Sequence, residues 1–222
     1  MKFLIFLFTI LMFSAEGTGQ NRQDIFYNEV TFYLNEKGEN LGRAQFEQIL
    51  KENASSFHRW DQVENDSIRI ARLIPKKESF NVSYPRIYKA LEEITQTTYQ
   101  GNPMIIIHYN FVNDLCSPAS GYNYWNDLRI RRKKRFSDNL NRRLEKDFPN
   151  VVALHFFEPG ITIEPSQILK QHFLIDNTLF FRNTIFKTQS SCGSVAIIRP
   201  GGNVVIFNGE TPIPEISDSL ED

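Results

Sequence analysis

Apolar and polar positions alternate in patterns that divide the chain into two regions. The first, residues 20–100, is predicted to contain, in chain order, a strand, a helix, a strand and a helix over residues 29–34, 44–51, 67–73 and 84–95. In the second helix Ile87, Leu91 and Ile94 stand at i, i+4 and i+7, so one helix face is apolar. We expect this region to be an accessory α+β extension without chemistry of its own.

The second region, residues 101–222, begins after the break at Gly101-Asn102-Pro103. Met104–Asn110 and Val151–Phe157 are continuous apolar runs, which is the pattern of strands that are buried on both faces of a sheet. A helical pattern over residues 122–146 separates them. Strand, helix and strand in this order predict a right-handed parallel β-α-β unit.

The remainder of the second region predicts more helix and then a hairpin. The predicted elements are helices at 166–174 and 177–183 and strands at 195–198 and 204–207, which flank the turn Pro200-Gly201-Gly202-Asn203. The fold class is therefore α/β, with a β-α-β unit followed by helix and β-hairpin.

The first 19 residues have the pattern of a cleaved secretory signal peptide. Lys2 precedes an apolar run from Phe3 to Phe13, and small residues follow around Ala15. A membrane anchor is the alternative, but this run is shorter than the roughly 20 residues that cross a bilayer. No later stretch is long and apolar enough to span. We expect an exported protein, periplasmic or extracellular, without a transmembrane segment after signal removal.

Composition narrows the class of partner. The chain of 222 residues is 41% hydrophobic and 23% charged, as in ordinary globular proteins, and its net charge is −1. A nucleic-acid-binding surface normally gives a basic excess, so nucleic acid is not the expected partner. No phosphate-binding glycine loop is present, and the histidines and cysteines lack the spacing of a zinc site. We expect neither a cofactor nor a metal.

Cys116 and Cys192 are the two cysteines, and an exported protein can keep them as a disulfide. Cys116 lies between a predicted strand and a predicted helix. The free N–H groups and the dipole of a helix start stabilise a thiolate, and Pro118 suits a first helical turn. The alternative is that Cys116 is a small apolar residue filling a gap.

The segment IIIHYNFVNDLCSPA resembles the active-site segment of the thioredoxin-like thiol-disulfide oxidoreductases, particularly their exported bacterial branch. Phe111 stands five residues before Cys116 as the family's phenylalanine does. Leu115 occupies the position of the motif tryptophan, Pro118 that of the motif proline, and Ala119 that of the second cysteine. IIRPGGNVVIFNGE resembles the family's hairpin. The resemblance covers about residues 103–210 and implies a thioredoxin-like fold over residues 101–222.

The resemblance also implies where a partner for Cys116 would lie. The family's cis-proline precedes the hairpin and faces the active cysteine; here Cys192 or Gly193 occupies that position. We therefore expect Cys116 and Cys192 to form a disulfide, with Gly193 easing the backbone. Pro118 and Gly193 would contact the substrate. The prolines near the C-terminus predict a final helix that is absent or very short.

Two functions follow from this pairing. In the first, the protein is an enzyme that exchanges thiols and disulfides of protein partners, with Cys116 as nucleophile and Cys192 as resolving thiol. In the second, it is a non-catalytic binding or structural module, and the same disulfide is a staple. The sequence leaves both open.

A basic run, RIRRKKR at residues 129–135, lies on the predicted helix after Cys116. It would suit an acidic protein partner, anionic lipid or an envelope polyanion, or else be an ordinary solvated helix face. Trp125 would either border a peptide groove or pack beneath the helix.

Overall fold

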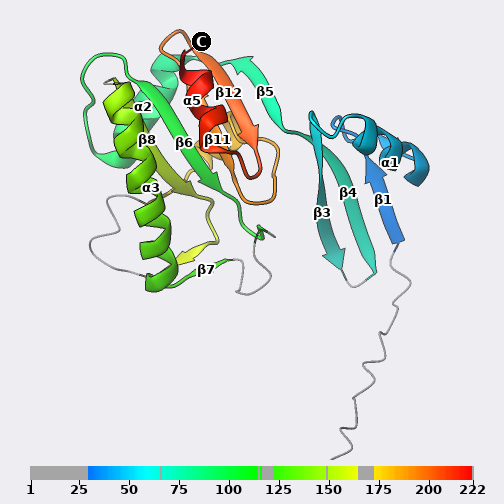
Figure 1. Cartoon of the computed structure of the whole chain (residues 1–222). Coiled ribbons are helices and arrows are strands. Elements are labelled where there is room, and N and C mark those ends of the chain that lie inside the picture. Colours follow the sequence, from blue (N-terminus) through cyan, green and yellow to red (C-terminus); the bar gives the residue numbers. More distant parts are fainter. Residues whose placement is uncertain are drawn as a thin grey trace, which may run out of the picture.

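The computed structural model describes residues 30–221 except positions 66, 115, 117–122, 149 and 165–172. The predicted signal peptide and Pro118 therefore lie outside the described residues. Two sheets organise the described part of the chain, a four-stranded one and a six-stranded one (Figure 1). The α/β class expected from the sequence is confirmed.

The four-stranded sheet has the order β2-β1-β4-β3. Its elements, with the helix that covers one face, are β1 (Val30–Leu34), β2 (Asn40–Leu41), α1 (Arg43–Glu52), β3 (Phe57–Asn65) and β4 (Ile68–Pro75). β1 runs parallel to β4, and the other pairs are antiparallel. The apolar residues of α1 share one helix face, and this face packs on the sheet. Phe46 on this face is fully buried and packs with Ala71 and Leu73 of β4.

The six-stranded sheet has the order β10-β8-β6-β11-β12-β5. Its strands are β5 (Lys77–Asn81), β6 (Met104–Asn110), β8 (Val151–Phe157), β10 (Phe173–Ile175), β11 (Ser194–Ile198) and β12 (Asn203–Asn208). β6, β8 and β10 are parallel, whereas β11 is antiparallel to both β6 and β12. A separate parallel pair, β7 (Tyr124–Trp125) and β9 (Thr162–Ile163), lies beyond the main sheet.

Helices cover both faces of the six-stranded sheet. They are α2 (Tyr84–Thr95), α3 (Asp127–Asp147), α4 (Phe180–Thr184) and α5 (Ile213–Glu221). α2 and α4 pack on the face that carries Ile105 and Ile107, while α3 and α5 pack on the face that carries Ile106 (Figure 1). These three isoleucines of β6 are fully buried, so β6 is a covered central strand as its apolar run predicted.

Three predicted helices differ from the structure. The helix predicted over 122–146 begins at Asp127, because Tyr124 and Trp125 pair with β9 as strand β7. The helix predicted over 166–174 is wrong at its end, since Phe173 and Leu174 belong to strand β10 and pair with β8; residues 166–172 lie outside the described part. The final helix is also longer than expected. α5 spans nine residues, because Pro214 stands in its first turn, where a missing N–H is tolerated, and Ile216 and Leu220 are buried against the sheet.

The two sheets are joined through consecutive strands. β4 leads through Lys76 directly into β5, and the Asn208 side chain of β12 donates a hydrogen bond to the Pro75 carbonyl. β5 and α2 therefore belong to the larger sheet, although they precede Gly101 in the sequence. Within the described part of the chain, no helix combines the length and the apolar character needed to cross a membrane.

Candidate functional site at the Cys116–Cys192 disulfide

Cys116 and Cys192 form a disulfide with an S–S distance of 2.08 Å and a Cα–Cα distance of 4.5 Å, as the sequence predicted. The topology brings them together. Cys116 follows the carboxyl end of β6 and Cys192 precedes the amino end of β11, and these strands are antiparallel neighbours in which Tyr109 pairs with Ser194. Cysteines that are 76 residues apart in sequence thus meet at one edge of the sheet.

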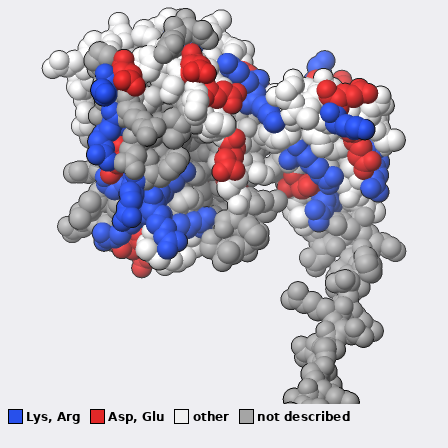
Figure 2. Space-filling model, viewed as in Figure 1, with Lys and Arg blue, Asp and Glu red and all other residues white. Residues whose placement is uncertain are grey.

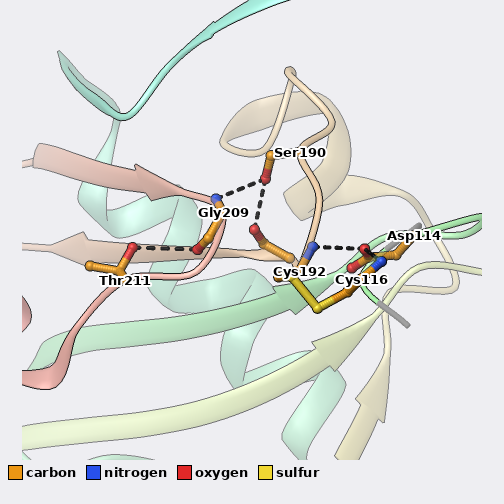
Figure 3. Close-up of a disulfide and its surroundings, with 7 residues drawn as sticks. Asp114, Cys116, Ser190, Cys192, Gly209 and Thr211 are labelled. Carbon is orange, nitrogen blue, oxygen red and sulfur yellow. Dashed lines mark hydrogen bonds between the residues drawn. A yellow bond between two sulfur atoms is a disulfide. The ribbon is translucent and has the colours of Figure 1, made fainter. Parts of the chain in front are cut away.

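Asp114 links the two cysteines through its carboxylate. Its Oδ1 atom accepts hydrogen bonds from the backbone N–H groups of Cys192 (2.7 Å) and Cys116 (3.0 Å) (Figure 3). Burial raises the pKa of Asp114 above its ordinary value, although these N–H donors and the nearby Lys133 act in the opposite direction. A carboxyl group with a raised pKa therefore lies within one short hydrogen bond of both disulfide-bearing residues.

Two cations of α3 lie beside the same bond. Arg129 and Lys133 line a cavity of about 90 Å³ together with Asp114, Cys116 and Cys192; Asn110, Phe111 and Trp125 complete its lining. Burial lowers the pKa of Lys133, and the charge of Asp114 opposes that change. Positive charge close to a cysteine favours the thiolate over the thiol, so this environment favours a reactive sulfur.

Trp125 contributes to both alternatives that the sequence left open. Its ring lines the cavity beside Cys116 and also packs against Phe157, with ring centroids 5.0 Å apart. The Arg129 guanidinium lies 4.0 Å from the centroid of the Trp125 ring, which holds that cation beside the cavity.

The backbone at Cys192 and Gly193 is left-handed, with φ values of 68° and 77°. An ordinary residue rarely adopts this conformation, and at Gly193 a Cβ atom would stand 2.4 Å from the Tyr109 carbonyl oxygen. Gly193 therefore allows the segment that carries Cys192 to pass close to β6. The role in substrate binding that the resemblance implied for Gly193 and Pro118 stays a prediction.

Hydrogen bonds hold the Cys192 segment from the side of β12. The Gly209 N–H donates to Ser190 Oγ (Figure 3). It also donates to the Gly193 carbonyl, to which the Ser190 hydroxyl donates as well (2.7 Å). The Ser194 hydroxyl donates to Asn208 Oδ1 at 2.9 Å. These hydrogen bonds hold the segment that carries Cys192 against the β11–β12 hairpin.

The segment that leads to Cys116 is held on its other side. The Val112 N–H donates to Glu158 Oε2 (2.8 Å), and Gln189 Nε2 donates to the Val112 carbonyl (2.7 Å). Glu158 also pairs with Arg182, whose Nε lies 2.9 Å from Oε1. These contacts hold the loop that follows β6. Cys116, further along this loop, is exposed to solvent.

A larger cavity, of about 520 Å³, lies between the two sheets and also contacts Cys192. Its lining residues are His58, Arg59, Lys76, Ser191, Cys192, Asn208, Gly209, Glu210, Thr211, Pro212 and Glu215. Burial and the charge of Lys76 lower the pKa of His58, which favours the neutral imidazole. The disulfide thus has a cavity on each side of Cys192.

The histidines that the structure describes do not form a metal centre at this site. His108 and His155 stack in the core with ring centroids 4.4 Å apart, and burial lowers the pKa of His108 to about 3. Among the residues whose positions are described, no group of three or more histidines, cysteines and carboxylates is close enough to hold a metal ion.

Sequence reasoning found Cys116, Cys192 and Gly193 but not Asp114 or Lys133. The helical phase offered one signal, because Lys133 follows the buried Ile130 by three residues and therefore turns inward. Comparisons with protein-family models, with curated proteins and with solved structures found no match.

Proposed function

We propose that the protein is an exported, thioredoxin-like thiol-disulfide oxidoreductase with Cys116 as nucleophile and Cys192 as resolving thiol. The observation that carries the proposal is the setting of the bond: an exposed Cys116 joined to Cys192, with Asp114 hydrogen-bonded to both backbones and two cations beside them. Protein thiols and disulfides are the substrates of such an enzyme.

The arrangement of the larger sheet supports the thioredoxin-like part of the proposal. A parallel β8-β6 pair continues into the antiparallel β11-β12 hairpin, with helices on both faces. Cys116 follows the first strand of this unit and Cys192 precedes the hairpin, which are the places that the resemblance implies. β5 and β10 extend the sheet, and the four-stranded sheet forms the N-terminal extension.

The proposed reaction begins from the reduced protein. The Cys116 thiolate attacks one sulfur of a substrate disulfide, that S–S bond breaks, and the other substrate sulfur leaves and takes a proton. The Cys192 thiolate then attacks Cys116 Sγ in the mixed disulfide, and the second substrate sulfur leaves as a thiol. Two electrons and two protons pass to the substrate, and the Cys116–Cys192 bond remains.

The surrounding groups suit these steps. Lys133 and Arg129 stabilise the Cys116 thiolate by their charge, which raises the fraction of nucleophile at neutral pH. Asp114, as carboxylate, takes the proton of the Cys192 thiol before the second attack. The pKa of Asp114 is raised, so it lies closer to the pKa of a thiol than the pKa of an ordinary aspartate does. Proton transfer from the thiol to this carboxylate is therefore easier.

A direct test uses the reduced protein and hydroxyethyl disulfide, a neutral small substrate. We expect the Cys116–Cys192 bond to form with release of mercaptoethanol, and much faster in the folded protein than in the same protein in denaturing urea. Alkylation of free thiols followed by mass spectrometry measures both rates. Equal rates in the folded and unfolded protein would contradict the proposal.

A structural staple is the second candidate function of the bond. It is favoured by the hydrogen bonds that fix Cys192 to the hairpin through Ser190, Gly193 and Gly209. A staple would resist reduction and show no turnover, whereas the proposed enzyme needs a bond that partner thiols can open.

A further inference from the structure

Helix α3 carries a large excess of positive charge next to the disulfide. Its 21 residues include nine lysines and arginines and four aspartates and glutamates, a net charge of +5, although the whole chain has a net charge of −1. Figure 2 shows the basic side chains gathered along this helix. The charge is therefore segregated on one element.

Four of the nine cations of α3 lie on its outer face. Arg131, Arg135, Arg142 and Lys146 are spaced by four, seven and four residues, which places them on one side of the helix, and all four are exposed. The opposite side packs against the sheet through Ile130 and Leu144. The outer face thus presents a cationic stripe to solvent.

Acidic residues of the helix neutralise only part of this charge. Asp127 pairs with Arg131 at 2.6 Å, and Asp138 pairs with Lys134 at 2.7 Å. Within the described portion of the chain, no ion pair holds Arg132, Arg135 or Lys146. Their guanidinium and ammonium groups remain available to an anionic partner.

Positive charge also lies on the side of α3 that faces the disulfide. Arg129 and Lys133 leave the same helix toward the cavity that Cys116 and Cys192 line. A chain whose cysteine approaches Cys116 would therefore place its neighbouring residues along α3. The cationic stripe and the two cations beside the disulfide therefore belong to the same helix.

We infer that α3 selects substrate proteins whose reactive cysteine is flanked by aspartates and glutamates. This inference rests on the proposed function and names its substrate class. A lipid surface fits less well, because interfacial helices insert an exposed apolar face and α3 buries its apolar side in the sheet. Among its described side chains, only Leu128 is a large exposed apolar one.

The size of the effect follows from surface electrostatics. Several ion pairs of the exposed kind together change binding or association by about tenfold, and this gain falls as salt screens them. Selection for acidic segments should therefore be strong at about 0.01 M ionic strength and weak well above 0.15 M.

The test separates binding from exchange. Two fluorescent peptides carry a serine in place of the cysteine, flanked in one by four glutamates and in the other by four lysines, and anisotropy measures their binding to the full protein. We expect the glutamate peptide to bind about tenfold more tightly at low salt. In the double variant Arg132→Glu/Arg135→Glu this preference should vanish. The control Lys37→Glu/Lys51→Glu should keep it, because these lysines lie in the turn before β2 and in α1, away from α3 in the sequence.

The matching cysteine peptides, as mixed disulfides with mercaptoethanol, give the exchange rates. Each rate is divided by the rate with hydroxyethyl disulfide, which has no charge. A loss of exchange with hydroxyethyl disulfide would refute the proposed function, whereas a change in the ratio alone reports on selectivity for the peptide. Equal binding of the glutamate and lysine peptides would overturn the inference. Binding to vesicles of anionic lipid without binding to the glutamate peptide would overturn it as well.

Discussion

Gly193→Ala tests the close passage of the Cys192 segment over β6. The new methyl group would stand 2.4 Å from the Tyr109 carbonyl oxygen, and the residue would have to keep a φ near 77°. A left-handed conformation costs an alanine about 1–2 kcal/mol. Relief of the contact requires a shift of buried backbone, which costs a further 1–3 kcal/mol or so by the usual effect of overpacking. We expect a loss of about 2–5 kcal/mol in the free energy of unfolding.

Urea denaturation of the oxidised protein measures this loss. Gly201→Ala is the matched control, because Gly201 lies in the hairpin turn with no atom within 4 Å of its would-be Cβ and no positive φ. That variant should change stability by less than about 1 kcal/mol. If Gly193→Ala is as stable as Gly201→Ala, then the Cys192 segment does not pass over β6 as described.

Three further predictions concern the disulfide and Asp114. Cys116→Ser should abolish exchange with hydroxyethyl disulfide, whereas Cys192→Ser should accumulate a mixed disulfide on Cys116 that mass spectrometry detects; turnover by Cys116→Ser would contradict the assignment of the nucleophile. Replacing both cysteines by alanine should lower the free energy of unfolding, measured in urea, by about 4 kcal/mol relative to the oxidised protein, since the bond closes a long loop. Asp114→Asn should slow exchange about 100-fold. In the wild-type protein, protonation of Asp114 as pH falls through its raised pKa should slow exchange, because the carboxylate that accepts the proton is lost. The asparagine variant should keep only the decline caused by protonation of the Cys116 thiolate. A pH profile of the same shape in both proteins would refute the role of Asp114.

The sequence predicted the elements whose pattern is strong. β6 and β8 have the expected bounds because both faces of each strand are covered and their apolar runs end at polar residues. α2 also has the expected bounds, since Ile87 and Leu91 mark a clear apolar face. The pairing of the cysteines followed from the resemblance, which put Cys192 or Gly193 at the position that faces the family's active cysteine.

Weakly patterned elements were missed. β3 (Phe57–Asn65) carries mostly polar residues and was not predicted, because strands at the edge of a sheet need little apolar surface. β5 (Lys77–Asn81) is an edge strand of the same kind. β10 has only three apolar residues, and its pairing with β8, a contact distant in sequence, decides its conformation.

The chemistry around the bond was also only partly visible in the sequence. Asp114 lies outside any helix or strand, so no periodic pattern marks it in the sequence. Its carboxylate accepts a hydrogen bond from the N–H group of Cys192, 78 residues later in the chain. Lys133 is one of several cations in the basic run at 129–135, so its inward position beside the disulfide was not predicted. Tertiary contact gives both residues their role.

The reduction potential of the Cys116–Cys192 bond, measured together with turnover, tests the proposed function most directly. The protein is equilibrated in dithiothreitol and glutathione buffers, and the fraction of oxidised protein is determined by thiol alkylation. We expect a potential above about −300 mV and repeated turnover with hydroxyethyl disulfide when glutathione is supplied to reduce the Cys116–Cys192 bond after each cycle. A potential below that value without turnover would show that the bond is a staple and would contradict the enzyme.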